Sequence, residues 1–232
     1  MAAHDVAVGL IWYVVLLFSL TFHEAGHAWA AARGGDPTAY LGGQVSLDPT
    51  PHMRREPFGM LLVPVLSFAW MGWMIGWAST PYDPRWAYAH PRRAGWMALA
   101  GPAANLVLVI VGGVGIRVAM FVGLVDPARL GSFTELVVGS GAPLGDAVAL
   151  FLSLLFMLNL LLLVFNLIPM PPLDGSGVVA LLLPEDTSRR LQQLLARPLF
   201  AFGGILIAWF AIPRIFWPVA QFAAAIVFPE YL

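Results

Sequence analysis

Long apolar stretches, separated by short polar segments, dominate the pattern of hydrophobic and polar positions in this chain. A helix needs ~20 mostly apolar residues to cross a membrane. Runs that reach or approach this length cover 6–32, 94–122, 146–168, 192–212 and 214–230, and a further apolar run covers 58–78. The pattern predicts an all-α membrane protein, a polytopic helical bundle of about five to six transmembrane segments.

The run at 58–78 is the hardest to place, and the arginines favour one topology for it. None precedes residue 6, but two groups follow the first and third main runs: Arg33, Arg54, Arg55, Arg85, Arg92 and Arg93, then Arg189, Arg190 and Arg197. Because cytoplasmic loops are enriched in basic residues, we expect the N-terminus outside and both ends of 33–93 in the cytoplasm. The 58–78 run is then a re-entrant segment, whose helix Pro64, Gly72 and Gly76 can interrupt. The alternative is an ordinary spanning helix, with the later topology inverted.

Residues 38–47 differ from their apolar surroundings. Their sequence, Thr-Ala-Tyr-Leu-Gly-Gly-Gln-Val-Ser-Leu, is polar and β-prone enough to predict a short strand or a small β-hairpin after the first helix. An exposed edge there would accept another extended chain as an added strand. No internal repeat or low-complexity segment is visible, so we expect residues 1–232 to form a single integral-membrane domain.

Composition and charge narrow the function classes. Of the 232 residues 59% are hydrophobic and 11% charged, whereas a soluble domain carries about a quarter charged residues. The lipid bilayer is therefore an expected partner. The net charge of -1 leaves no basic surface for nucleic acid. Cysteine is absent, which excludes disulfides, cysteine metal sites and thiol catalysis.

The clearest chemical motif is His-Glu-Ala-Gly-His at 23–27, inside the first apolar run. Residues four apart share a helix face, so His23 and His27 can bind one metal ion, with Glu24 beside them as a general base. Ionisable groups within apolar helices are costly and are rare without a function. The alternative, a chance pair of solvated histidines, is much weaker in this setting than in a soluble helix.

A catalytic zinc site is expected to have three protein ligands and an open position. The stretch Asn166-Leu-Ile-Pro-Met-Pro-Pro-Leu-Asp174-Gly175 supplies a candidate, because its three prolines must break the preceding apolar helix. Asp174 can then project from a non-helical turn. It can also serve as the N-cap of a helix over 175–183, and the two roles are compatible.

Several other polar residues lie near these motifs. Asn105, in Gly101-Pro-Ala-Ala-Asn105, can hydrogen-bond to the active-site helix or merely fill a packing notch between helices. Asn159 is expected to be a packing amide, whereas Asn166 adjoins the broken helix and has better access to the metal. The loop histidines His52 and His90 are expected to be solvated.

Taken together, the three motifs resemble the site-2 protease family of intramembrane zinc metalloproteases. They occur in the family's order and span residues from about 10 to 183. The resemblance implies one Zn²⁺ per chain held by His23, His27 and Asp174, with Glu24 as general base and Asn166 holding the substrate backbone or the oxyanion. It also implies core helices at about 6–32, 94–122 and 146–183, with accessory helices at about 192–230. The chain lacks the PDZ and cystathionine-synthase-like domains of many members, and so resembles a minimal one.

The implied activity is endopeptidase cleavage of membrane-spanning or signal-peptide-like substrates, such as anti-sigma factors or remnant signal peptides. The implied location is the plasma membrane of a prokaryote, with the active site towards the cytoplasmic side. Two rivals remain open. A catalytically inactive scaffold of the same fold would be expected to lose Glu24 or a ligand. A metal transporter would not need Glu24, and would more usually show repeated halves.

Overall fold

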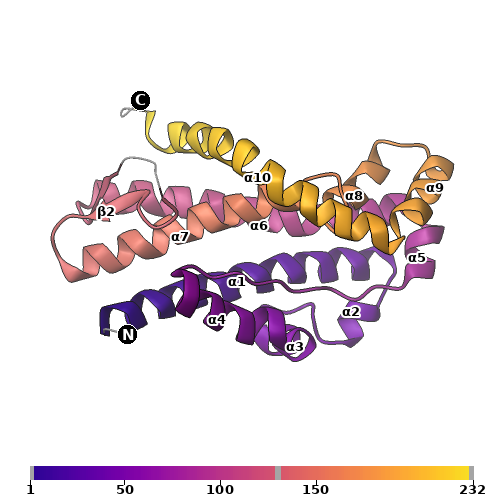
Figure 1. Cartoon of the computed structure of the whole chain (residues 1–232), viewed down its shortest axis with the longest axis horizontal. Helices are drawn as coiled ribbons and strands as arrows, with labels where there is room; N and C mark the ends of the chain where they lie inside the picture. Colours follow the sequence, from indigo (N-terminus) through magenta and orange to yellow (C-terminus); the bar gives the residue numbers. More distant parts are fainter. Residues whose placement is uncertain (1–2, 129–131, 230–232) are drawn as a thin grey trace.

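The computed structural model describes residues 3–128 and 132–229. Four helices in this part of the chain are long and apolar enough to cross a membrane: α1 (Ala3–Gly34), α6 (Pro91–Phe121), α7 (Pro143–Asn166) and α10 (Pro198–Val227). They run lengthwise through the molecule and alternate in direction (Figure 1). The predicted class, a polytopic helical membrane protein, is confirmed.

The predicted number of spans was too high, because 192–212 and 214–230 are not separate helices. Residues 198–227 form one continuous helix, α10, which contains Pro213 and Pro218. A proline removes one backbone donor and can bend a helix without ending it in an apolar setting. Before it lies the polar, amphipathic helix α9 (Glu185–Leu195), which is too short and too charged to span.

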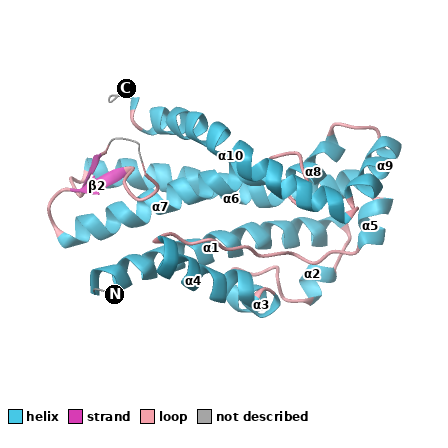
Figure 2. Ribbon diagram, viewed as in Figure 1, coloured by secondary structure: helices cyan, strands magenta, loops and turns pink. Residues whose placement is uncertain are grey.

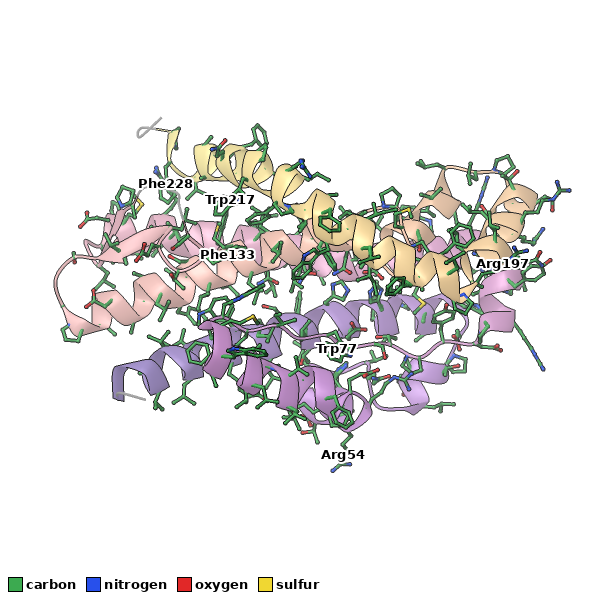
Figure 3. All side chains as sticks on the ribbon, viewed as in Figure 1. Arg54, Trp77, Phe133, Arg197, Trp217 and Phe228 are labelled. Carbon is green, nitrogen blue, oxygen red and sulfur yellow. The ribbon has the colours of Figure 1, made fainter. Side chains whose placement is uncertain are left out.

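The 58–78 segment doubles back, as the arginine distribution predicts. It follows α3 (Pro49–Arg55) and consists of a π-helical turn, η1 (Phe58–Leu62), and helix α4 (Val63–Met71). Gly72, at φ 76°, ends α4 in the left-handed region that glycine tolerates best. The chain then returns in extended form beside α1, near Trp77 in Figure 3. The backbone N–H of Trp77 donates a hydrogen bond to the Gly59 carbonyl oxygen at 3.2 Å. The two ends of the 58–78 segment thus lie side by side, at the same height along the bundle.

The small hairpin exists, but the prediction that placed it at 38–47 was wrong. Asp36 accepts hydrogen bonds from the Thr38 N–H at 3.0 Å and from its hydroxyl at 2.5 Å. This local bonding starts a helical turn, α2 (Thr38–Leu41), and outweighs the β propensity of the segment. The antiparallel pair is instead β1 (Val125–Pro127) with β2 (Val137–Gly139), in register Asp126 to Val138 (Figure 2).

Arg197 lies at one end of the bundle, together with Arg33 and Arg93 at the junction of α1 and α6, whereas Arg54 lies on α3 along its side (Figure 3). At the end that contains Arg197, α1 terminates, α6 begins after α5 (Pro84–Ala89), and α9 leads into α10. Hydrogen bonds connect these elements. The Trp86 indole N–H of α5 donates to the Gly34 carbonyl oxygen of α1 at 3.1 Å, and Arg189 of α9 donates to the Tyr88 carbonyl oxygen of α5 at 3.2 Å. The aromatic residues Phe133, Trp217 and Phe228 lie at the opposite end (Figure 3).

Small residues let α1, α6 and α7 approach closely. A Cβ added at Gly26 of α1 would lie 2.8 Å from the Ala100 carbonyl oxygen of α6. One added at Gly112 of α6 would lie 3.2 Å from the Phe156 backbone N of α7. Membrane helices gain most of their association energy from such close packing. The three helices that carry the sequence motifs therefore form the tightest part of the bundle.

Candidate metal centre

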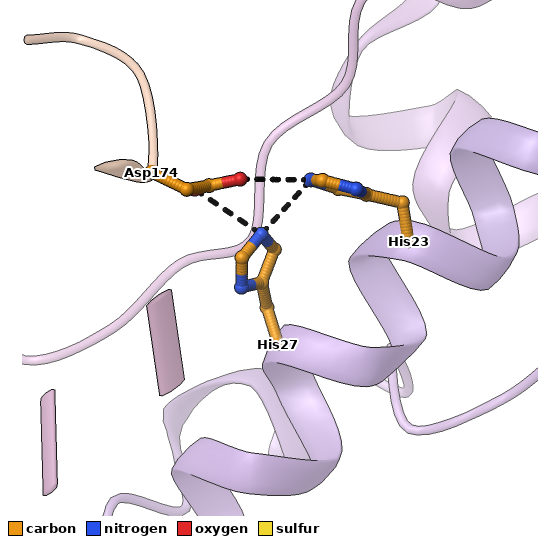
Figure 4. Close-up of side chains that lie close together, drawn as sticks. All are labelled: His23, His27 and Asp174. Carbon is orange, nitrogen blue, oxygen red and sulfur yellow. Dashed lines mark hydrogen bonds and ion pairs between the residues drawn. The ribbon is translucent and has the colours of Figure 1, made fainter. Parts of the chain in front are cut away.

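Three side chains from two distant parts of the sequence converge in the half of the bundle that contains the C-terminal half of α1. His23 and His27 project from the same face of α1, and Asp174 reaches them from the turn after α7 (Figure 4). The Nε2 atoms of the histidines are 3.0 Å apart. Asp174 Oδ2 lies 3.1 Å from His23 Nε2, and Asp174 Oδ1 lies 3.3 Å from His27 Nε2.

Asp174 takes this position because the proline-rich stretch ends α7 at Asn166. It occupies the N-cap position of α8 (Gly175–Val178), which continues as the 3₁₀ turn η2 (Val179–Leu181), a shorter helix than the predicted 175–183. Its side chain makes no capping hydrogen bond. Of the two roles compatible with the sequence, the geometry shows the one directed at the histidines.

Both imidazole rings are held through Nδ1, which leaves Nε2 facing the centre. His27 Nδ1 lies 2.7 Å from the Met97 carbonyl oxygen, which can only accept, so Nδ1 carries the proton. His23 Nδ1 lies 2.5 Å from Asn105 Oδ1 and donates in the same way. Histidines that ligate metals usually donate their other ring N–H to such a partner.

This arrangement fits a metal ion. Two Nε2 lone pairs and a carboxylate face one another across about 3 Å, which is repulsive unless positive charge lies between them. Asp174 Oδ2 is buried and has no hydrogen-bond partner among the described residues. A proton on one ring nitrogen would satisfy one of these contacts, whereas a metal ion would satisfy all three. Two histidines and one carboxylate form a ligand set typical of catalytic zinc.

A carboxyl group must be deprotonated to bind a metal ion, so Asp174 would hold the ion as a carboxylate. Gly101 of α6 lies against the two rings, and a Cβ there would lie 2.6 Å from His23 Nε2. The pocket for the ion thus depends on a residue that has no side chain.

Glu24 is buried beside the three candidate ligands but does not join them. The Thr80 hydroxyl lies 2.7 Å from Glu24 Oε2 and 3.0 Å from the Glu24 backbone oxygen, and it holds the carboxylate in place. Thr80 belongs to the extended return after α4. No sequence motif predicts this contact, because Thr80 lies outside all three motifs.

A cavity of about 680 Å³ surrounds the site. Its lining includes the three candidate ligands and Glu24, the extended segment at Ala78–Thr80, and Gln192 of α9. Asn166, the last residue of α7, also lines it, so it can reach a molecule in the cavity. His52 lies elsewhere: it is buried rather than solvated, and its Nε2 donates to the Ser46 carbonyl at 3.2 Å.

Comparison with known proteins places this chain in a family. The sequence profile of Peptidase family M50 matches residues 11–210, most of the chain. The chain belongs to peptidase family M50. The resemblance to site-2 proteases is thereby confirmed, and the chain is an integral-membrane zinc metalloprotease.

Curated relatives carry corresponding names. "Putative zinc metalloprotease YwhC" of Bacillus subtilis (strain 168) is 34% identical over 181 residues, which cover 78% of this chain and 72% of the relative. "Putative zinc metalloprotease Rip2" of Mycolicibacterium smegmatis is 34% identical over 175 residues, 75% of this chain but 58% of that relative. The match thus spans less than two thirds of Rip2. No solved structure gives a significant match to the chain.

Proposed function

We propose that the chain is an intramembrane endopeptidase, which hydrolyses peptide bonds in or near the transmembrane segments of other membrane proteins. The observation that carries the proposal is the position of His23, His27, Glu24 and Asp174 in one cavity bounded by membrane-length apolar helices. A hydrolytic site at such a depth suits substrates that are themselves in the membrane.

His23, His27 and Asp174 would hold the zinc ion. Zinc, when bound in such a site, lowers the pKa of a water molecule towards ~7 and polarises a carbonyl group. Glu24, oriented by Thr80, accepts the proton of the attacking water and later delivers it to the departing amine. Asn166, which also lines the cavity, donates its amide N–H to the substrate backbone or to the developing oxyanion.

A substrate helix must unwind before cleavage, because its peptide groups are hydrogen-bonded internally. The edge expected at 38–47 is not a strand, but the extended segment 78–80 lines the cavity directly beside Glu24. Its main chain offers the peptide groups that an unwound substrate needs as partners. This segment therefore takes over the role that the sequence assigned to 38–47.

The orientation and the substrate class are part of the proposal. The site lies in the half of the bundle nearer to Arg33, Arg93 and Arg197, which under the positive-inside rule supports a location towards the cytoplasmic side of a prokaryotic plasma membrane. Gln192 and Ser79 are among the polar residues that line the cavity, which supports the entry of water. Single-pass membrane proteins and remnant signal peptides are the substrate classes that the family resemblance implies.

Metal analysis of the detergent-purified protein tests the proposal without knowledge of the substrate. We expect about one zinc per wild-type chain and a clear loss in His23→Ala and Asp174→Ala. Glu24→Gln should keep its zinc and lose cleavage of single-pass membrane proteins co-reconstituted in liposomes. Zinc that persists in Asp174→Ala would place the third ligand elsewhere. Zinc flux that survives Glu24→Gln would indicate a transporter, and partner binding without cleavage would indicate a scaffold.

A further inference from the structure

A chain of buried hydrogen bonds links the candidate metal centre to the interior of the bundle. It runs from His23 through Asn105 of α6 and Asn159 of α7 to Ser19 of α1. Asn105 Nδ2 donates to Asn159 Oδ1 at 2.8 Å, and Asn159 Nδ2 donates to Ser19 Oγ at 2.9 Å. The side chains of Ser19, Asn105 and Asn159 are all fully buried. Such a network is costly unless every member is satisfied, and this one joins all three core helices.

The direction of every bond in this chain follows from one backbone carbonyl. Asn159 Nδ2 also lies 2.8 Å from the Leu155 carbonyl oxygen, which can only accept. The amide nitrogen of Asn159 therefore faces Leu155, and its oxygen faces Asn105. Asn105 must therefore donate to that oxygen from its amide nitrogen, which leaves the Asn105 oxygen to accept a hydrogen bond from His23 Nδ1.

The two histidines are supported in different ways. The partner of His27 is the Met97 carbonyl, a backbone group that cannot reverse its role. The partner of His23 is a side-chain amide, whose oxygen and nitrogen exchange places on a 180° rotation. If Asn105 presented its nitrogen, the proton of His23 would have to move to Nε2, and that atom could no longer bind a metal ion. Only His23 thus needs a further residue to define its tautomer.

We propose that Asn159 is a positioning residue for the metal centre: it fixes the amide of Asn105, and through it keeps His23 Nε2 free of a proton. Among the described residues, Asn159 makes no hydrogen bond to the three candidate ligands and does not line the cavity, so it acts on the site through Asn105. The expected effect of Asn159 on metal binding rests on the proposed zinc site. The tautomer itself is a property of the chain without the ion.

The test compares Asn159→Leu with the wild-type protein by two measurements. In zinc-free protein labelled with ¹⁵N-histidine, at a pH where the rings are neutral, the Nδ1–H form of His23 should give way to a mixture with the Nε2–H form. The Kd for zinc, from competition with a chelator, should rise ~10-fold, at the lower end of the ~10–100-fold typical of lost outer-shell partners. Unchanged tautomer and unchanged Kd in a folded variant would overturn the proposal.

Two further variants separate this role from a loss of packing. Ser19→Ala removes a bond of Asn159 that is not needed to orient it, because the Leu155 carbonyl remains, so the zinc Kd should stay within ~2-fold of wild type. Asn105→Asp offers His23 two equivalent acceptor oxygens, so adding Asn159→Leu to it should cause no further loss. A merely structural Asn159 would instead weaken zinc binding equally in both backgrounds. A wild-type protein that shows the Nδ1–H tautomer but binds no zinc would refute the proposed metal site, and would leave the effect of Asn159 on the His23 tautomer unrefuted.

Discussion

Replacing Gly101 with alanine should remove the metal centre while leaving the bundle folded. The added Cβ would overlap His27 Nε2, and it would lie 2.6 Å from both His23 Nε2 and His27 Cε1. Ordinary van der Waals contact begins at 3.4 Å, so both rings would have to retreat by about 0.8 Å or more. Both displaced rings belong to the candidate ligands, so the effect falls directly on the metal.

The tolerance of a zinc site sets the size of the expected effect. Zn–N distances lie near ~2.0–2.1 Å and vary by only about 0.2 Å. A displacement several times larger breaks coordination, so the loss of zinc affinity should exceed the ~10–100-fold typical of an outer-shell change. Alanine is a better helix former than glycine by ~1 kcal/mol, so α6 itself is not weakened by the substitution.

The assay is zinc content and zinc Kd in detergent, together with helicity and thermal melting. The matched control is Gly115→Ala, the same substitution in the same helix. Its Cβ would meet only the flexible end of the Leu152 side chain, at 2.9 Å for the nearest atom, and this variant should bind zinc as wild type does. A folded Gly101→Ala protein that binds zinc with wild-type affinity would refute the reasoning, because the ion would then have to lie elsewhere.

Three other predictions concern the surroundings of the site. Thr80→Val keeps the side-chain volume but loses the bond to Glu24, worth ~1.5–3 kcal/mol for a charged acceptor, so kcat should fall ~10-fold or more with zinc content unchanged. Gly204→Ala would drive a Cβ into the Pro171 carbonyl oxygen and lower stability by ~1–3 kcal/mol, measured by melting against Gly203→Ala, whose Cβ meets nothing within 4 Å. Burial raises the pKa of Asp36, but hydrogen bonds from Thr38 and Asp83 outweigh it and hold the pKa below its ordinary value. Asp36 therefore stabilises the fold above the unfolded pKa of ~3.9, and this contribution is lost as the pH falls through the lower native pKa. Asp36→Asn should flatten the dependence of melting temperature on pH in that range, and a slope equal to wild type would contradict the assignment.

Sequence alone determined the features that depend on local periodicity. Each of these features can be recognised in a short stretch of sequence: the apolar runs of spanning length, the i, i+4 histidine pair, and the proline-rich break before Asp174. The helical membrane class and the family resemblance followed from them. The doubling back at 58–78 followed from arginine positions and helix breakers, which are also local signals.

Local signals failed where two of them competed. Residues 38–47 are β-prone, but Asp36 bonds Thr38 and starts a helical turn. Pro213 is a strong breaker in sequence terms, but α10 passes through it. In both places the surroundings of the residue decided the local structure. The intrinsic propensity of the residues for helix or strand did not decide it.

Only the tertiary structure decided which residues support the site. Thr80 reaches Glu24 across 56 positions, and Asn159 reaches Ser19 across 140, so no window of sequence contains either pair. These contacts arise because small residues such as Gly26 and Gly112 bring α1, α6 and α7 close enough for short polar side chains to meet. The motifs name the candidate ligands, but helix packing determines how the ligands are oriented, because orientation depends on neighbours that the chain supplies from elsewhere.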